Sequence, residues 1–156
     1  MSVKRVECLS LVEDYATIEC SVRLRNRTTT FNRITFILNY DVNPIFRFTL
    51  FYKFSNGMYR KFLVDITEDL CGYIEGKRFA PLMNLLWGSV TNYTNIEGCP
   101  LKKGVEYYIK DFVFDPSVFP PGAISGQYRV DIRTVNAIDR KKIFLIQGYA
   151  EVESLL

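Results

Sequence analysis

Residues 71–100 read CGYIEGKRFAPLMNLLWGSVTNYTNIEGCP, and this stretch breaks the alternating pattern of the rest of the chain. Between its two cysteines, apolar residues recur three or four positions apart, at Phe79, Leu82, Leu85 and Leu86, with Trp87 beside them. That spacing is typical of one face of a helix. We therefore expect one helical segment, with a cysteine at each end, in a chain that otherwise consists of strands.

On both sides of this stretch, polar and apolar residues alternate in short runs, as in strands with one buried and one solvated face. In the clearest run, 15–26, one parity is apolar: Ala16, Ile18, Cys20, Val22 and Leu24. The runs expected to form strands are 4–9, 15–26, 34–40, 46–54, 59–66, 105–114, 126–136 and 141–152. This pattern predicts an all-β fold, a sandwich of about seven to eight antiparallel strands with the helical segment near its mouth.

Three connecting segments carry their own signals. Residues 27–32 read as a polar turn, and Thr67 is placed to cap a helical turn that runs through Leu70. Residues 115–125 contain three prolines and a glycine among apolar side chains, which excludes regular secondary structure. Such an apolar loop either packs on the body of the protein or binds something.

The length of 156 residues predicts one domain, 1–156, with a core that needs no metal. No apolar run approaches the roughly 18 residues that span a bilayer, so we expect no integral membrane segment. The net charge is +3, from 20 basic and 17 acidic residues that are interspersed, which argues against a nucleic-acid partner. The one local cationic excess, expected to be a solvated strand face rather than an anion site, is Arg23, Arg25, Arg27 and Arg33.

The chain contains no histidine. Ser-His-Asp and Cys-His nucleophilic sites, imidazole general bases and nearly all catalytic zinc sites require one. A carboxylate-based hydrolase stays as an alternative, but no pair of acidic residues stands in a recognisably apolar setting. We therefore predict a protein that is not an enzyme and has no cofactor or metal.

The four cysteines, Cys8, Cys20, Cys71 and Cys99, include no C-x-x-C pair. Zinc clusters and redox motifs are therefore disfavoured, and disulfides in an oxidising compartment fit better. Three pairings are possible, and Cys8 with Cys20 and Cys71 with Cys99 is favoured because each closes a local excursion of the chain. Four free thiols in a cytosolic protein are the alternative.

Secretion agrees with two sequons, which begin at Asn26 and Asn92 and make these residues candidate glycosylation sites. The N-terminus, MSVKRVEC, has no apolar segment of the kind found in a signal peptide. We expect a secreted protein in its mature form, with an added initiating methionine.

A set of residues spread over the whole chain resembles a large insect family of secreted proteins of unassigned function. That family is similar to the ML lipid-recognition domain and to insect chemosensory proteins of the ganglioside-activator type. The elements that carry the resemblance are Cys8 with Cys20, Asn26-Arg27, Asp65-x5-Cys71, Asn95 with Cys99-Pro100, and Phe119-Pro120-x4-Ser125-Gly126-x-Tyr128-Arg129.

The resemblance implies an immunoglobulin-like β-sandwich whose sheets splay apart to hold acyl chains, sterols or similar molecules between them. The expected ligand is then a hydrophobic small molecule, such as a lipid, a sterol or a pheromone-like compound. The residues expected at the mouth are Phe79, Leu82, Leu86 and Trp87. Those expected along the walls are Phe46, Phe48, Phe62, Phe112, Phe114, Phe119 and Tyr128.

Ordinary core packing is the competing interpretation of each of these residues. If the core is filled, the protein is an interaction module that recognises a receptor or a surface through its loops. The apolar loop 115–125 and the cationic strand would then be its site. The sequence leaves open whether the sandwich is hollow or filled.

Overall fold

The computed structural model describes residues 2–24, 26, 30–76, 84, 87–88, 90–113 and 124–153. In these residues the elements are β1 (Ser2–Ser10), β2 (Ala16–Leu24), β3 (Thr30–Leu38), β4 (Pro44–Lys53), β5 (Tyr59–Asp69), α1 (Leu70–Ile74), the 3-10 turn η1 (Thr91–Tyr93), β6 (Glu106–Phe112), β7 (Gly126–Asn136) and β8 (Lys142–Val152). The predicted all-β class and strand number are confirmed.

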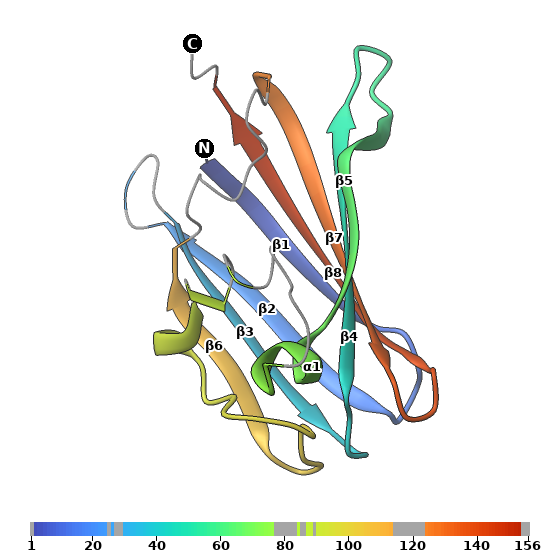
Figure 1. Ribbon diagram of the computed structural model, residues 1–156. Helices are drawn as coiled ribbons and strands as arrows, with labels where there is room; N and C mark the ends of the chain where they lie inside the picture. The colour runs from blue at the N-terminus through green and yellow to red at the C-terminus, as the bar shows by residue number, and fades with distance from the viewer. Residues whose placement is uncertain are drawn as a thin grey trace.

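The strands form two antiparallel sheets that face each other (Figure 1). The larger sheet has five strands in the order β1-β8-β7-β4-β5, and the smaller has three in the order β2-β3-β6. The rings of Phe36 in β3 and Phe144 in β8 meet across the sandwich, with centroids 5.5 Å apart. Since side chains alternate along a strand, the even-numbered residues of β8 therefore face the smaller sheet.

One long edge of the sandwich is closed by the chain itself. The connection from β1 to β2 passes from the larger sheet to the smaller one, and the Cys8–Cys20 disulfide joins the two strands with Cα atoms 5.7 Å apart. At the opposite edge, the last strand of the larger sheet is β5 and the last strand of the smaller sheet is β6. The helix α1 lies against β4 near this edge.

The helix α1 is fixed at both the backbone and the side-chain level. The carboxylate of Asp69 accepts hydrogen bonds from the backbone N–H groups of Cys71 (3.0 Å) and Gly72 (3.2 Å), which satisfies two of the free donors at the helix start. The Cys71–Cys99 disulfide ties the helix to the segment before β6. Both disulfides are the pairs that the sequence favoured.

Three local predictions are wrong. Thr67 does not cap a helix, because β5 continues in register with β4 as far as the pair Ile45 and Asp69, and Asp69 provides the cap. The polar turn ends earlier than predicted, since β3 already begins at Thr30. Leu24 has the inward parity of β2 but is 71% exposed, because it lies at the end of the strand.

A bulge changes which residues of β6 face inward. The register with β3 shifts between Asn32 and Ile34, and Asp111 adopts a positive φ of 55°. Before the bulge, Tyr107 pairs with Phe36 and faces inward. After it, Phe112 faces inward and is also buried, although its parity is opposite to that of Tyr107. This bulge explains why neither parity of the run 105–114 is cleanly polar.

Candidate functional site

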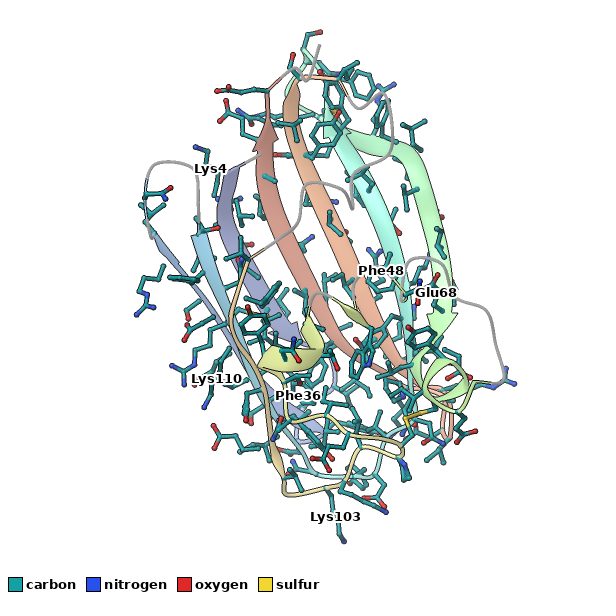
Figure 2. All side chains as sticks on the ribbon, turned by 60° about the vertical axis from the view of Figure 1, so that its left-hand side comes forward. Lys4, Phe36, Phe48, Glu68, Lys103 and Lys110 are labelled. Carbon is teal, nitrogen blue, oxygen red and sulfur yellow. A yellow bond between two sulfur atoms is a disulfide. The ribbon has the colours of Figure 1, made fainter. Side chains whose placement is uncertain are left out.

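The predicted wall residues come together on the inner faces of the two sheets, where the structure describes them. Phe48, Phe112 and Tyr128 are buried, and Phe46 and Phe62 are half-buried. Figure 2 labels Phe48 on β4 of the larger sheet. The remaining predicted residues, Phe79, Leu82, Leu86, Phe114 and Phe119, lie outside the described part of the chain.

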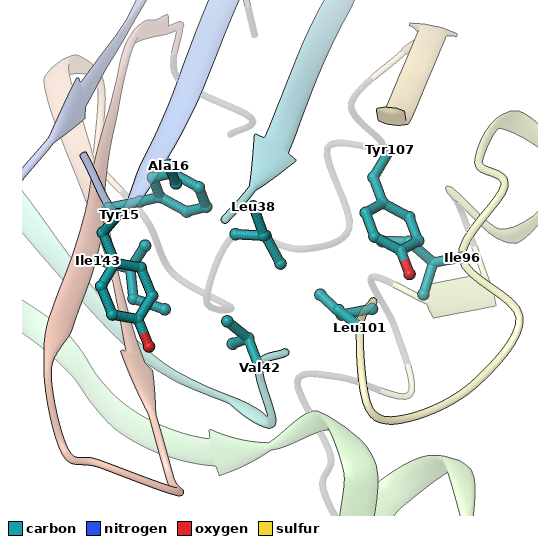
Figure 3. Close-up of a cluster of buried hydrophobic side chains, with 9 residues drawn as sticks. Tyr15, Ala16, Leu38, Val42, Ile96, Leu101, Tyr107 and Ile143 are labelled. Carbon is teal, nitrogen blue, oxygen red and sulfur yellow. The ribbon is translucent and has the colours of Figure 1, made fainter. Parts of the chain in front are cut away.

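One end of the sandwich is filled by large side chains, and we call this cluster the packed end. Both sheets and the loops that join them contribute to it, and Figure 3 shows these side chains converging on Leu38 and Val42. Its buried members are Tyr15, Ala16, Leu38, Val42, Ile96, Leu101, Tyr107, Ile143 and Phe144.

The polar groups at the packed end are also satisfied. The hydroxyl of Tyr15 donates a hydrogen bond to Asp139 (2.8 Å) and accepts one from the amide of Asn136 (2.7 Å). Burial raises the pKa of the Tyr15 hydroxyl, so the group stays neutral and keeps both bonds. This end therefore has the properties of a conventional core.

Away from that end, the inner faces of the central strands are not fully covered. The larger sheet contributes Val130 and Ile132 from β7 and Ile146 from β8, and all three are half-buried. Val22 in β2 and Ile34 in β3, which face them from the smaller sheet, are also half-buried. We call the inward apolar residues Val6, Val22, Ile34, Val130, Ile132 and Ile146, together with Gly148, the open region.

Gly148 gives the most direct measure of space in the open region. It pairs with Val6 on one side and Val130 on the other, so it lies on an interior strand of the five-stranded sheet, and its even number places it on the inward face with Phe144. Apart from its two chain neighbours, a Cβ atom built on Gly148 would have no atom of the described residues within 4 Å. An interior strand thus presents bare backbone to a space between the sheets that no described side chain fills. The sequence analysis did not single out Gly148, although a glycine inside a strand pattern marks a place where another group approaches the backbone.

Trp87 and α1 lie between these two parts of the interior. Trp87 is half-buried and contacts both the packed end and a second cluster around Phe48 and Leu70. Leu70 is the first residue of α1 and is buried against the inner face of β4. The predicted position of Trp87 beside the interior therefore agrees with its contacts, while its role toward a ligand stays a prediction.

A cluster of aromatic rings anchors the chain where it enters β7. The Tyr128 hydroxyl donates to the carbonyl of Ile124 (2.6 Å), and the Tyr52 hydroxyl donates to the carbonyl of Ser125 (3.1 Å). Gly126 has φ of +149°, and a Cβ there would lie 2.6 Å from the Tyr52 ring. Gly126 is therefore required by both its backbone angle and the close approach of Tyr52, and burial raises the pKa of Tyr128.

The outer face of the larger sheet is covered by its own charged and aromatic side chains. Asp131 is only 1% exposed there, and it accepts hydrogen bonds from Arg129 (2.8 Å) and from Gln147 (3.3 Å). The Arg129 guanidinium in turn lies 4.3 Å from the centre of the Phe51 ring. On β7, a carboxylate on the outer face is thus more buried than the valine and isoleucine that face inward, which is the reverse of a normal sandwich.

A second ion network lies on the same outer face. Arg47 donates two hydrogen bonds to Asp65, and Lys61 lies 3.1 Å from the same carboxylate. These bonds hold the pKa of Asp65 well below its usual range. Because these charged side chains are exposed, the outer face of the sheet stays in contact with water. The apolar face of the same sheet is then the one that packs against the smaller sheet.

The other predicted sites are at the surface. Asn26 and Asn92 have exposed side chains, as glycosylation requires. Arg23 and Arg33 are exposed on the outer face of the smaller sheet, in agreement with a solvated strand, whereas Arg25 and Arg27 lie outside the described residues. Across the described ranges, no three His, Cys, Asp or Glu residues are arranged to hold a metal ion.

Comparisons with known proteins identify a family model and a solved structure. No curated protein matches the chain. The structure is similar to the crystal structure of a Niemann-Pick type C2 protein from the Japanese carpenter ant, with a TM-score of 0.46 and 16% sequence identity, over 98% of this chain and 100% of that one. A family model described as "Protein of unknown function (DUF1091)" matches residues 46–130, more than half of the chain.

Proposed function

The chain belongs to the DUF1091 family of proteins of unknown function, and we propose that it binds a hydrophobic small molecule between its two sheets. The family match confirms the resemblance to a family of unassigned function that the sequence suggested. The observation that carries the proposal is the unfilled space at Gly148, on the inner face of a central strand. The ligand class is a lipid, a sterol or a pheromone-like compound.

The physical argument is that the open region leaves apolar surface wet in the free protein. Val130, Ile132 and Ile146 are half-buried on central strands, where a filled sandwich would bury them. A ligand that covers them gains about 0.8 kcal/mol for each methylene transferred from water. Loss of ligand freedom opposes part of that gain, so a medium-length chain is sufficient for binding with few polar contacts.

The interior also offers little to fix a polar ligand. Two buried side-chain atoms in the described residues have no hydrogen-bond partner, Asn32 Oδ1 and Thr134 Oγ1. The side chains that define the open region are all aliphatic. We infer selection by shape and apolar area rather than by hydrogen bonds. The absence of histidine from the chain supports a non-catalytic binder or carrier.

We also propose that the protein acts outside the cytosol. Two disulfides support an oxidising compartment, and the exposed Asn26 and Asn92 are available for glycosylation. The described residues contain no helix that is both long and apolar enough to cross a bilayer. Secretion from insect cells, followed by mass measurement of each Asn→Gln variant, tests both sequons.

Native mass spectrometry of the protein secreted from insect cells tests the binding proposal. The sample is measured before and after extraction with organic solvent and refolding, and then after incubation with fatty acids and sterols. We expect a discrete hydrophobic adduct that extraction removes and that an offered lipid replaces. An unliganded mass in every sample would contradict the proposal and favour the alternative, an interaction module that recognises a receptor through its loops.

A further inference from the structure

A second hollow lies on the outer face of the larger sheet, and it is separate from the open region. It has a volume of about 430 Å³, within the range of small-molecule sites. Its lining comes from β1, β4, β5, β7 and β8 at the end of the sheet remote from the packed end. The side chains that the argument uses are Lys4, Arg5, Lys53, Tyr59, Gln127 and Tyr149, and Glu151 is the only carboxylate in the lining.

Strand parity places this pocket on the outside of the sandwich. Gln127 pairs with Glu151, and Lys53 pairs with Tyr59, in the same alternate rows as the outward-facing Arg129. The inward-facing rows hold Gly148 and Val130 instead. Tyr128 and Ala150, of the inward-facing rows, also border the pocket, but most of its lining belongs to the outward rows, so the pocket opens mainly on the outer face.

The charges around the pocket are unbalanced. Lys4 lies 3.7 Å from Glu151, and both side chains are well exposed, so this ion pair is weak and easily exchanged. Lys53 donates a hydrogen bond of 3.3 Å to the neutral amide of Gln127, and in the described residues it has no ion pair with a carboxylate. The described lining has three cations and one carboxylate, and Arg5 also pairs with Glu7 beside the pocket (3.4 Å). With two carboxylates against three cations, the positive excess is at Lys53.

The groups around the pocket are held in place by aromatic rings. The Arg5 guanidinium lies 3.9 Å from the centre of the Tyr149 ring, and Tyr149 meets Tyr59 edge to face with centroids 6.1 Å apart. The hydrogen bond between Arg5 and Tyr149 raises the pKa of the guanidinium, as does the nearby Glu7. Stacking restricts the arginine and so lowers the entropy cost of using it to bind an anion.

We propose that the outer pocket binds the phosphate or sulfate group of a small organic anion, with Lys53, Lys4 and the stacked Arg5 as its cationic partners. Three donors of positive charge around a concave, tyrosine-lined surface suit a monoester of this kind. The amide nitrogen of Gln127 and the ring of Tyr59 can contact the neutral part of the same molecule. The anion is either a soluble compound or the headgroup of an anionic lipid.

Two-dimensional amide NMR titrations of the full chain with glycerol 3-phosphate and with glucose 6-sulfate test the proposal. We expect saturable shifts confined to residues around Lys53, Gln127 and Tyr149, which weaken as sodium chloride is added. Glycerol and glucose serve as neutral probes and should give no shifts. Vesicles of phosphatidylcholine with and without phosphatidic acid, whose headgroup is a phosphate monoester, distinguish a lipid headgroup from a soluble anion in a sedimentation assay.

Matched charge variants separate a built site from general attraction. Lys53→Gln and Lys4→Gln remove one positive charge at the pocket, and Lys103→Gln removes the same charge from the other end of the molecule (Figure 2). We expect the Kd to rise about tenfold in Lys53→Gln and to change little in Lys103→Gln. Equal weakening in all three variants, or shifts spread over the whole surface, would overturn the proposal.

Anion binding to the outer pocket can be tested independently of apolar-ligand binding between the sheets. A Gly148→Leu variant, which changes only the interior, should bind the anion as the unmodified protein does. If neither soluble monoester nor anionic vesicle binds, the outer pocket is not an anion site, and the lipid-binding proposal is untouched.

Discussion

The packed end and the open region are built by the same strands but filled differently. At the packed end, Leu38 is 1% exposed and Ile143 is 0% exposed, and residues from loops complete the contacts. In the open region, Ile132 and Ile146 are half-buried, and Gly148 has no side chain in a place where one would fit. The difference suggests that one part of the interior stabilises the fold while the other is left available for binding.

The physical origin of the difference lies in side-chain size and in the loops. Val42, Ile96 and Leu101 come from connections between strands and close the packed end as a lid would. On β8, the inward residues after Ile146 are Gly148 and Ala150, the two smallest side chains. A sandwich with small residues on a central strand cannot reach normal interior density there without a guest.

The largest expected effect is at the packed end. Leu38→Ala should lower the free energy of unfolding by about 3 to 4 kcal/mol, because it removes a fully buried side chain from a rigid cluster. Urea denaturation with intrinsic fluorescence measures the change. A loss below about 1 kcal/mol would mean that the packed end is as loosely filled as the open region.

The next effect concerns the edge that joins the two sheets. Replacing both Cys8 and Cys20 by Ala should lower the free energy of unfolding by about 3 kcal/mol, since the bridge closes a loop with a sequence separation of 12. The same denaturation assay applies without reductant, so that the Cys71–Cys99 disulfide stays intact, and the oxidised wild-type protein is the control. An unchanged midpoint would show that apolar contacts alone hold this edge.

A smaller loss is expected in the open region. Ile146→Ala should cost about 1 kcal/mol in the unliganded protein, well below the value for a buried isoleucine, because its side chain is partly solvated already. The cost should increase when the protein is saturated with a lipid that covers this position. If Ile146→Ala lowers the free energy of unfolding as much as Leu38→Ala does, the interior is uniformly filled. The open region and the packed end would then not differ.

The smallest effect tests the polarity of the interior. Thr134 is buried on the inner face of β7, and its hydroxyl has no hydrogen-bond partner among the described residues. Thr134→Val keeps the shape and removes that group, so it should stabilise the protein by up to about 1 kcal/mol. The shift of the melting temperature in thermal unfolding shows whether the variant is more or less stable. A clear destabilisation would mean that the Thr134 hydroxyl makes a stabilising interaction.

Much of the fold could be predicted from alternation, because one face of each strand has to be apolar. The closing hairpin of β7 and β8 was predicted with nearly correct bounds, and in β2 the inward set was correct from Ala16 to Val22. The alternation of polar and apolar residues predicts which face of the sheet a side chain points to. It does not predict which other residues cover that side chain. That is why Leu24 was wrongly expected to be buried and why the half-burial of Ile132 could not be foreseen.

Features that depend on pairing between distant strands could not be predicted. Thr67 does not cap a helix because β5 stays paired with β4 as far as Asp69. The bulge at Asp111 brings Phe112 inward against its parity. The empty position at Gly148 depends on what the opposite sheet places across from it. For the same reason, the sequence could name aromatic wall residues but could not say that the space lies beside a glycine.

The most direct test of the central claim is a fluorescence titration of Gly148→Leu with cis-parinaric acid. The control is Ser21→Leu, which adds the same side chain on the exposed outer face of β2. We predict that Gly148→Leu raises the Kd at least about tenfold with an unfolding free energy equal to or above that of the unmodified protein, while Ser21→Leu binds normally. Unchanged binding by Gly148→Leu, or no binding by the unmodified protein, would contradict the claim that the sandwich is hollow for a ligand.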